Sequence, residues 1–384
     1  MRPITIRLSA FAFLLLAITP AAIAQQAPPD AIADYRRKLA EFQAAHDAYE
    51  AAAGAYWSSI AEKRRGRNAK RRNHLAVALD DYVLTQPPVY AGPRRPVNPQ
   101  PEPEPEATPR PQKIIPVVAD LLKAASDYFQ WAPQRPASEA EFKRAYAGFA
   151  IRSGLTREQA VRVYAFETGG NGSHDMQAGL GSWRPGAHAI STAIGYNQLL
   201  TTNSVELIAE QGPLFLKVLG ERAASLSGPA RQAMDSKIAV LKKMVALARS
   251  VPDEWSEHEK MGDTPQGWAL HAMVLDVDVG PMLQTRKLLT SVQFARTKGY
   301  NRPLAAAELE MMNLTGDSTG LDMVTMPPDM REQVPTANFF QRSGYERNPV
   351  ASRNNTVAKL FEVTDARMDA NSNLPGAREL AAAF

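Results

Sequence analysis

Residues 156–170 read TREQAVRVYAFETGG. A threonine followed three residues later by Gln159 forms a capping box, which predicts that a helix begins here. Apolar residues then recur at helical spacing until Gly169 and Gly170, and glycine is poorly tolerated inside a helix but favoured just past its end. The stretch therefore predicts an amphipathic helix with one acid, Glu167, in its last turn.

The same helical pattern recurs along the chain. Ser138 with Glu141 three residues later predicts another helix start. Apolar residues lie at helical spacing in residues 30–60, 234–248 and 268–279. Runs that alternate apolar and polar residues are scarce, so a sizeable sheet is not expected. The sequence predicts a mainly α fold.

Glu167 is the first candidate for chemistry. Apolar neighbours and the negative end of the helix dipole both disfavour a charged carboxylate, so the pKa of this side chain should be raised. A carboxylic acid of this kind can act as a general acid near neutral pH, and cleavage of a glycosidic bond requires such an acid. The alternative is a solvated glutamate, which is common at helix ends.

A second polar run, STAIGYNQ, begins at Ser191 and follows that helix. Gly195 allows close approach of a backbone or a sugar ring. The amides of Asn197 and Gln198 suit hydroxyl and N-acetyl groups. These residues, together with Tyr196, are candidates for substrate binding. The alternative is a turn before a helix, with Gln198 acting only as a cap.

Together the two runs resemble the catalytic signature of the lytic transglycosylases with a lysozyme-like domain. In that family Glu-Ser/Thr is followed by a loop and then by Ser-x-Ala-x-Gly-x-x-Gln. The resemblance implies that Glu167 is the single catalytic acid and that Gln198 lines a saccharide cleft. The glycine and serine of the motif correspond to Gly195 and Ser191.

The family also has a later Tyr-Asn-Ala-Gly-Pro run, whose faint counterpart is VDVGP at residues 277–281. The resemblance thus makes Asp278 a further candidate for substrate binding. The implied activity is cleavage of the β-1,4 bond between N-acetylmuramic acid and N-acetylglucosamine in peptidoglycan, forming 1,6-anhydro-muramyl products. Two alternatives are a hydrolase of lysozyme type and a non-catalytic periplasmic protein that binds or scaffolds the wall.

Nothing in the sequence predicts a metal or a cofactor. The chain has no cysteine, which excludes disulfides and thiolate metal sites. His174, Asp175 and His188 are spaced too irregularly for a compact zinc site.

Residues 1–24 have the pattern of a cleaved signal peptide. A basic start precedes an apolar stretch, and the segment ends in small residues before Gln25. The apolar stretch is short for a membrane span, which favours cleavage over a retained anchor. We therefore expect a periplasmic or exported protein.

Residues 63–72 read KRRGRNAKRR, a dense basic block in a chain of net charge +4. An exported protein meets anionic wall polymers and membrane surfaces rather than nucleic acid. The expected partners are peptidoglycan glycan strands and, through Lys63–Arg72, an anionic wall polymer or membrane surface. The alternative is a solvated stretch without a partner.

Composition divides the mature chain into four regions. Residues 25–85 form a helical, basic N-terminal region, and residues 86–116 are rich in proline, which predicts an extended linker. Residues 117–369 are expected to hold the lysozyme-like domain. Residues 370–384 are small and polar, which predicts a flexible tail.

Overall fold

The computed structural model describes residues 27–100, 114–180 and 187–384. In these residues it contains sixteen α-helices, three short 3-10 helices and isolated β-bridges, with no strand. The prediction of a mainly α fold is confirmed. The expected signal peptide, residues 1–24, lies outside the described residues.

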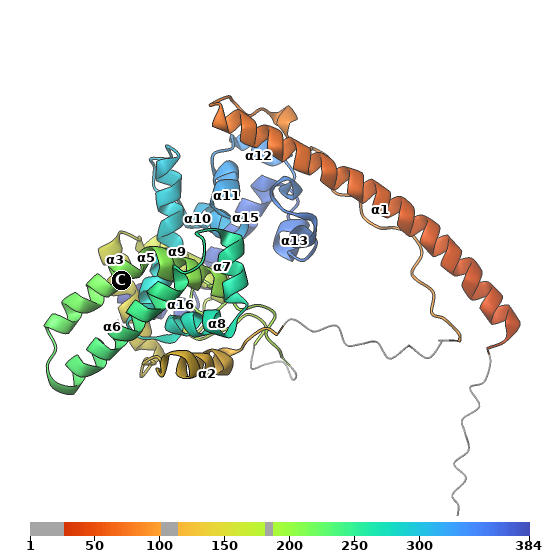
Figure 1. Cartoon of the computed structure of the whole chain (residues 1–384). Coiled ribbons are helices and arrows are strands. Elements are labelled where there is room, and N and C mark those ends of the chain that lie inside the picture. The colour runs from red at the N-terminus through yellow and green to blue at the C-terminus, as the bar shows by residue number, and fades with distance from the viewer. Residues whose placement is uncertain (1–26, 101–113, 181–186) are drawn as a thin grey trace, which may run out of the picture. The chain divides into compact units, whose positions relative to one another are not determined.

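The helices are numbered in chain order, and Figure 1 labels all of them except α4 and α14. They are α1 (Pro29–Arg72), α2 (Val118–Phe129), α3 (Glu139–Ser153), α4 (Arg157–Thr168), α5 (Thr201–Ala224), α6 (Gly228–Ala248), α7 (Trp255–Gly262), α8 (Pro265–His271), α9 (Val279–Thr297), α10 (Ala306–Thr315), α11 (Asp317–Val324), α12 (Pro328–Gln333), α13 (Arg342–Glu346), α14 (Pro349–Arg353), α15 (Val357–Ser372) and α16 (Pro375–Ala383). The 3-10 helices are η1 (Leu79–Asp81), η2 (Ala272–Leu275) and η3 (Thr336–Phe339).

The chain forms two compact units whose boundary falls inside α1, at Ala53 and Gly54. In the smaller unit, the ring of Tyr90 packs edge-on against the aromatic side of α1, with ring centroids 5.5 Å from Tyr49 and 6.2 Å from Phe42. At Tyr90 the proline-rich segment therefore packs on α1, whereas we expected an extended tether. Residues 101–113 lie outside the described residues.

The larger unit begins with the second half of α1, which belongs with the main domain rather than with a separate N-terminal region. The buried Arg67 donates to the carbonyls of Asp81 and Asn338, and its guanidinium lies 4.3 Å above the ring of Tyr82. Arg64 donates to Asn338 and Phe340. Part of the basic block is thus an internal contact of this unit.

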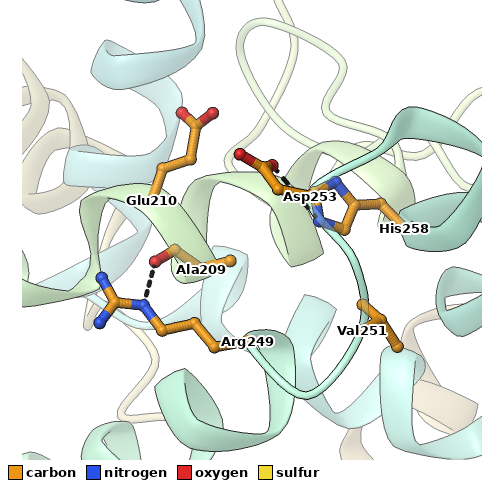
Figure 2. A pocket seen from close by; sticks show the side chains of 6 residues that line it. All are labelled: Ala209, Glu210, Arg249, Val251, Asp253 and His258. Carbon is orange, nitrogen blue, oxygen red and sulfur yellow. Dashed lines mark hydrogen bonds and ion pairs between the residues drawn. The ribbon is translucent and has the colours of Figure 1, made fainter.

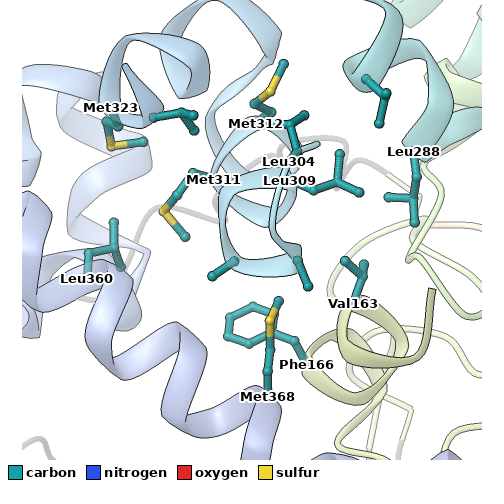
Figure 3. Close-up of a cluster of buried hydrophobic side chains, with 14 of the residues drawn as sticks. Val163, Phe166, Leu288, Leu304, Leu309, Met311, Met312, Met323, Leu360 and Met368 are labelled. Atoms are coloured by element: carbon teal, nitrogen blue, oxygen red, sulfur yellow. The ribbon is translucent and has the colours of Figure 1, made fainter. Parts of the chain in front are cut away.

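Two apolar clusters form the core of the larger unit. One includes α3, α4, α10, α11, α15 and α16, and Figure 3 shows its methionine-rich part around Met311, Met323 and Met368. The other joins α2, α5, α6, α8 and the first half of α9. α9 contributes Leu288 to the first cluster and Leu283 to the second, and so connects the two halves of the core.

The expected single helix over residues 268–279 is wrong. α8 ends at His271, η2 follows, and α9 starts afresh at Val279. The carboxylate of Asp276 accepts hydrogen bonds from the backbone N–H groups of Asp278 and Val279, at 2.9 and 3.1 Å. An aspartate that bonds to nearby backbone in this way competes with a continuous helix and starts a new one.

The expected flexible tail is also wrong. α15 extends to Ser372, and α16 buries Ala377 and Leu380 completely against the core. The N–H of Ala377 donates to the carbonyl of Gly170 at 2.8 Å. The tail therefore covers the turn that follows Glu167. Among the described helices, none is long and apolar enough to cross a membrane.

Candidate active site

A cleft of about 840 Å³ opens beside the end of α4, and Glu167 forms part of its wall. The other lining residues come from the loop before α5, from α5, α7 and α9, and from α10 and the start of α11. They are Gln198, Leu200, Asn203, Glu206, Leu207, Glu210, Gln211, Trp255, Lys287, Thr290, Ser291, Gln293, Phe294, Met312, Asn313, Leu314, Thr315, Gly316 and Asp317.

Local sequence explains the position of Glu167. The hydroxyl of Thr156 accepts from the backbone N–H of Gln159, and the side-chain Oε1 of Gln159 accepts from the backbone N–H of Thr156, both at 3.1 Å. This capping box starts α4 as predicted, and Gly169 ends it with a φ of 66°. The carboxyl of Glu167 is half-buried at the cleft, in the last turn of the helix.

A second acid, Glu310 of α10, lies against Glu167. The amide of Asn313 donates to Glu167 at 2.6 Å and to Glu310 at 3.5 Å, and the two carboxyls hydrogen-bond to each other. Glu310 is 1% exposed and is not among the residues that line the cleft. The site is therefore a pair of carboxyls, of which only Glu167 faces the cleft.

Burial raises the pKa of both acids. For Glu167 the charges of Lys287 and Arg367 oppose this rise, as does the hydrogen bond from Asn313. For Glu310 the rise is larger, because the negative charge of Glu167 adds to the effect of burial. Two carboxyls in contact cannot both ionise readily, so the pair retains a proton above the pH at which an ordinary glutamate loses it.

Gln198, the predicted cleft residue, does line the cleft together with Glu167. Its amide donates to the carbonyls of Gly195 and Met176, at 2.8 and 3.3 Å. Gly195 has a φ of 83°, and a Cβ there would lie 2.1 Å from the amide nitrogen of Gln284. Glycine is therefore required at this turn, which holds Gln198 in place.

The other candidates in this run lie outside the cleft lining. Tyr196 is fully buried, donates to Glu139 and packs edge-on against Tyr164. Asn197 is also fully buried, and its side chain donates to the carbonyl of Gln284 at 2.8 Å. The Ser191 hydroxyl accepts from the N–H of Ala193 at 2.9 Å. In the structure these side chains support the loop that carries Gln198.

Asp278 lies in a buried cluster of ions and not in the cleft lining. It pairs with Lys237 and Arg222. Lys237 also lies 2.9 Å from Asp276, and both of these side chains are almost completely buried. Burial raises the pKa of Asp276, and the positive charge of Lys237 opposes the rise.

Sequence reasoning missed Glu310 and Asn313, the two residues in contact with Glu167. A signal was available, because Glu310 stands between Leu309 and Met311 in a strongly apolar stretch. An acid in such a stretch is unusual and points to a buried polar role.

The lining of the cleft is rich in carboxylates. Glu206 and Glu210 lie one turn apart on α5 and Asp317 lies at the start of α11, with Lys287 as the one lining cation among the described residues. Burial raises the pKa of Glu206, and the charge of Glu210 adds to the rise. The lining as described therefore carries more acidic than basic side chains.

A smaller pocket of about 290 Å³ shares Glu210 with the cleft and is shown in Figure 2. Arg249 on its wall donates to the carbonyl of Ala209 at 2.7 Å, and the buried His258 lies 3.9 Å from Asp253. Over the described parts of the chain, no group of three histidine or acidic residues is arranged to hold a metal.

Comparison with known proteins adds no relative. No protein-family model matches the chain. No curated protein and no solved structure matches it either.

Proposed function

We propose that this protein is a peptidoglycan lytic transglycosylase that cleaves the bond between N-acetylmuramic acid and N-acetylglucosamine with Glu167 as its acid. One observation carries the proposal: a carboxyl with a raised pKa faces a cleft large enough for sugar residues and is held there by Asn313. Perturbed acids in clefts are typical of catalytic sites.

In the proposed reaction Glu167 first gives its proton to the glycosidic oxygen. The raised pKa keeps this proton bound above the pH at which an ordinary glutamate loses it. The N-acetyl group of the muramic acid stabilises the positive charge that develops, so a carboxylate nucleophile is not needed. The ionised Glu167 then accepts the proton of the C6 hydroxyl, which closes the 1,6-anhydro ring.

The lining of the cleft suits a glycan. Gln198, Asn203 and Asn313 offer amide donors and acceptors, and the half-exposed ring of Trp255 offers a flat apolar surface for a sugar ring. Residues 313–316 begin with asparagine and end with glycine beside Glu167.

A hydrolase of lysozyme type is the second candidate, because further carboxylates line the same cleft. Glu206 or Asp317 would orient a water molecule in such a reaction. The two candidates differ in their product, since hydrolysis leaves a free reducing end and transglycosylation leaves a 1,6-anhydro end.

The test compares wild type with Glu167→Gln on purified, insoluble peptidoglycan. Glutamine keeps the shape of the side chain but cannot donate the proton, so the rate should fall about 10²–10⁴-fold. Glu158→Gln, an exposed change on the same helix, serves as the matched control. Mass spectrometry of the released muropeptides should show 1,6-anhydro ends.

Three results would contradict the proposal. Equal rates for wild type and Glu167→Gln would remove Glu167 from the chemistry. Reducing ends in place of anhydro ends would favour the hydrolase. A wild type that binds the wall without cleaving it would favour the non-catalytic alternative.

We also propose export to the periplasm, on the sequence of residues 1–24. Within the basic block, Arg65 and Arg72 remain exposed, whereas Arg64 and Arg67 contact the carbonyls of Asn338 and Phe340. A contact with an anionic wall polymer or membrane surface would therefore use the exposed members of the block.

A further inference from the structure

Glu310 has a position that the proposed reaction does not use. It is 1% exposed and lies behind Glu167, outside the cleft lining, so it reaches neither a sugar nor a water molecule in the cleft. It nevertheless hydrogen-bonds to the carboxyl that would act as the acid. Any effect of Glu310 on the reaction must therefore pass through Glu167.

The contacts of the pair are few. Asn313, one turn after Glu310 on α10, bridges both carboxyls with one amide nitrogen. An amide is neutral, so it orients the two acids without compensating a negative charge. The pair must therefore limit its own charge, which it does by retaining a proton.

Other charged groups surround the pair on neighbouring helices. Lys287 of α9 and Arg367 of α15 are the nearby cations, and both favour the ionised form of Glu167. Across the cleft lie Glu206 and Glu210 of α5. Three further charged groups on neighbouring helices have partners of their own: Lys143 of α3 pairs with Glu379 of α16, Asp317 of α11 accepts from Ser291, and Asp322 of α11 pairs with Arg71.

We propose that Glu310 is a positioning residue that shares one proton with Glu167 and supplies it to the cleft carboxyl when Glu167 alone would be ionised. This inference rests on the proposed role of Glu167 as the acid. In this proposal two carboxyls act in place of a single acid. Glu167 faces the substrate, and Glu310 holds the shared proton when Glu167 is ionised.

The proton balance is closed. When the shared proton lies on Glu310, its transfer along the hydrogen bond protonates Glu167 and leaves Glu310 as a carboxylate. The O–H bond of Glu167 then breaks as the proton passes to the glycosidic oxygen, and the C1–O bond breaks with its electron pair on that oxygen. The C6 hydroxyl closes on C1 and returns its proton to Glu167, so the pair ends with the proton it began with.

The arrangement extends the working range of the acid. Coupled carboxyls lose their protons in two separate steps, and acid catalysis continues until the second step removes the shared proton. A lone Glu167 would lose activity at its single step. The pH dependence of cleavage therefore distinguishes a proton-sharing role from simple packing.

The first measurement is the pH profile of kcat/KM on soluble glycan strands for wild type, Glu310→Gln and the control Glu158→Gln. Glutamine can still donate a hydrogen bond to Glu167 but has no proton to give. The alkaline limb of Glu310→Gln should move down by about one pH unit or more, while that of Glu158→Gln stays at the wild-type position. An alkaline limb that stays in place overturns the proposal, whatever happens to the plateau.

The second measurement does not depend on activity. NMR titration of the side-chain carboxyl carbons should show two linked steps in wild type, and one step for Glu167 in Glu310→Gln. In Glu167→Gln the titration of Glu310 should shift to lower pH, because its charged neighbour is gone. Independent titrations in wild type and unchanged steps in both variants would overturn the inference.

The two measurements separate the two proposals. If wild type cleaves no peptidoglycan, the proposed function fails, and the titration still decides whether the carboxyls share a proton. If Glu310→Gln does not fold, as judged by circular dichroism, the titration of Glu310 in Glu167→Gln decides it.

Discussion

The protein buries two pairs of acids in different ways. Asp276 and Asp278 form ion pairs with the ammonium of Lys237, and Asp278 also pairs with Arg222. Neither aspartate lines the cleft. The oxygens of Asp276 accept further hydrogen bonds from backbone N–H groups, including that of Gln134 at 2.9 Å. Burial raises the pKa of Asp276, but Lys237 and the backbone N–H groups stabilise its ionised form and hold the pair in one arrangement.

Glu167 and Glu310 are treated differently. In the parts of the chain that the structure describes, their close polar contacts are the amide of Asn313 and each other. Burial without a matching cation destabilises the folded state unless the proton is retained. Burial alone therefore does not distinguish the candidate site, because both pairs are buried. The pair that lacks an ion-paired cation, Glu167 and Glu310, is the one at the cleft.

The largest effect is expected for Lys237→Ala in the compensated pair. Removing the ammonium leaves two buried carboxylates without their shared cation, which should lower the free energy of unfolding by about 3–5 kcal/mol. Urea unfolding at pH 7 measures it. Lys242→Ala, an exposed change on the same helix, should stay within about 0.5 kcal/mol of wild type. A loss under about 1 kcal/mol for Lys237→Ala would break the comparison, because the pair would not depend on its cation.

The next largest effect is on the pH dependence of stability and comes from His271, a buried base that has hydrogen-bond partners but no charged partner. The ring of His271 is fully buried between the hydroxyl of Ser204 at 2.7 Å and the carbonyl of Thr192 at 2.9 Å. Burial lowers its pKa to about 4. The unfolded chain binds this proton near pH 6.5, so the stabilisation present above that pH is lost as the pH falls towards 4, by about 3 kcal/mol.

Unfolding free energies at pH 7 and pH 4.5 for wild type and His271→Gln measure this loss. The variant keeps a donor and an acceptor but does not titrate, so its stability should depend less on pH over this interval. Parallel pH dependence in the two proteins would mean that the burial of His271 has no consequence for proton binding.

The sequence predicts the local parts of this site. Thr156, Gln159 and Gly169 define the start and end of α4 by contacts within a few residues, and the structure has them as expected. The turn at Gly195 that presents Gln198 is equally local. Such features depend on backbone geometry and capping, which short stretches of sequence determine.

The remaining parts depend on contacts between distant segments. Asn313 lies 146 residues from Glu167, and helical periodicity shows which face of α10 is apolar without showing which helix it meets. Burial within the basic block is equally hard to predict, because nothing in the neighbouring sequence distinguishes the buried Arg67 from the exposed Arg65. Packing of the tail likewise depends on a distant contact: the N–H of Ala377 donates to the carbonyl of Gly170, and a Cβ on Gly376 would lie 2.7 Å from the same oxygen.

The smallest expected effect is on the free energy of unfolding of Glu310→Gln, a variant of the pair that has no matching cation. Because the pKa of Glu310 is raised, the folded chain holds a proton that the unfolded chain has lost, and wild-type stability should fall as the pH rises above about 4.3, the ordinary value for glutamate. Glu310→Gln removes this loss and should gain about 0.5–2 kcal/mol at pH 8, with little change at pH 4.5. Thermal unfolding at both pH values measures this gain in stability.

A variant that is less stable than wild type at pH 8 would show that the negative charge of Glu310 is compensated by other groups in the folded protein. If Glu310→Gln is more stable than wild type but stops cleaving at a lower pH, the buried Glu310 carboxyl destabilises the fold and at the same time supplies the proton that Glu167 uses.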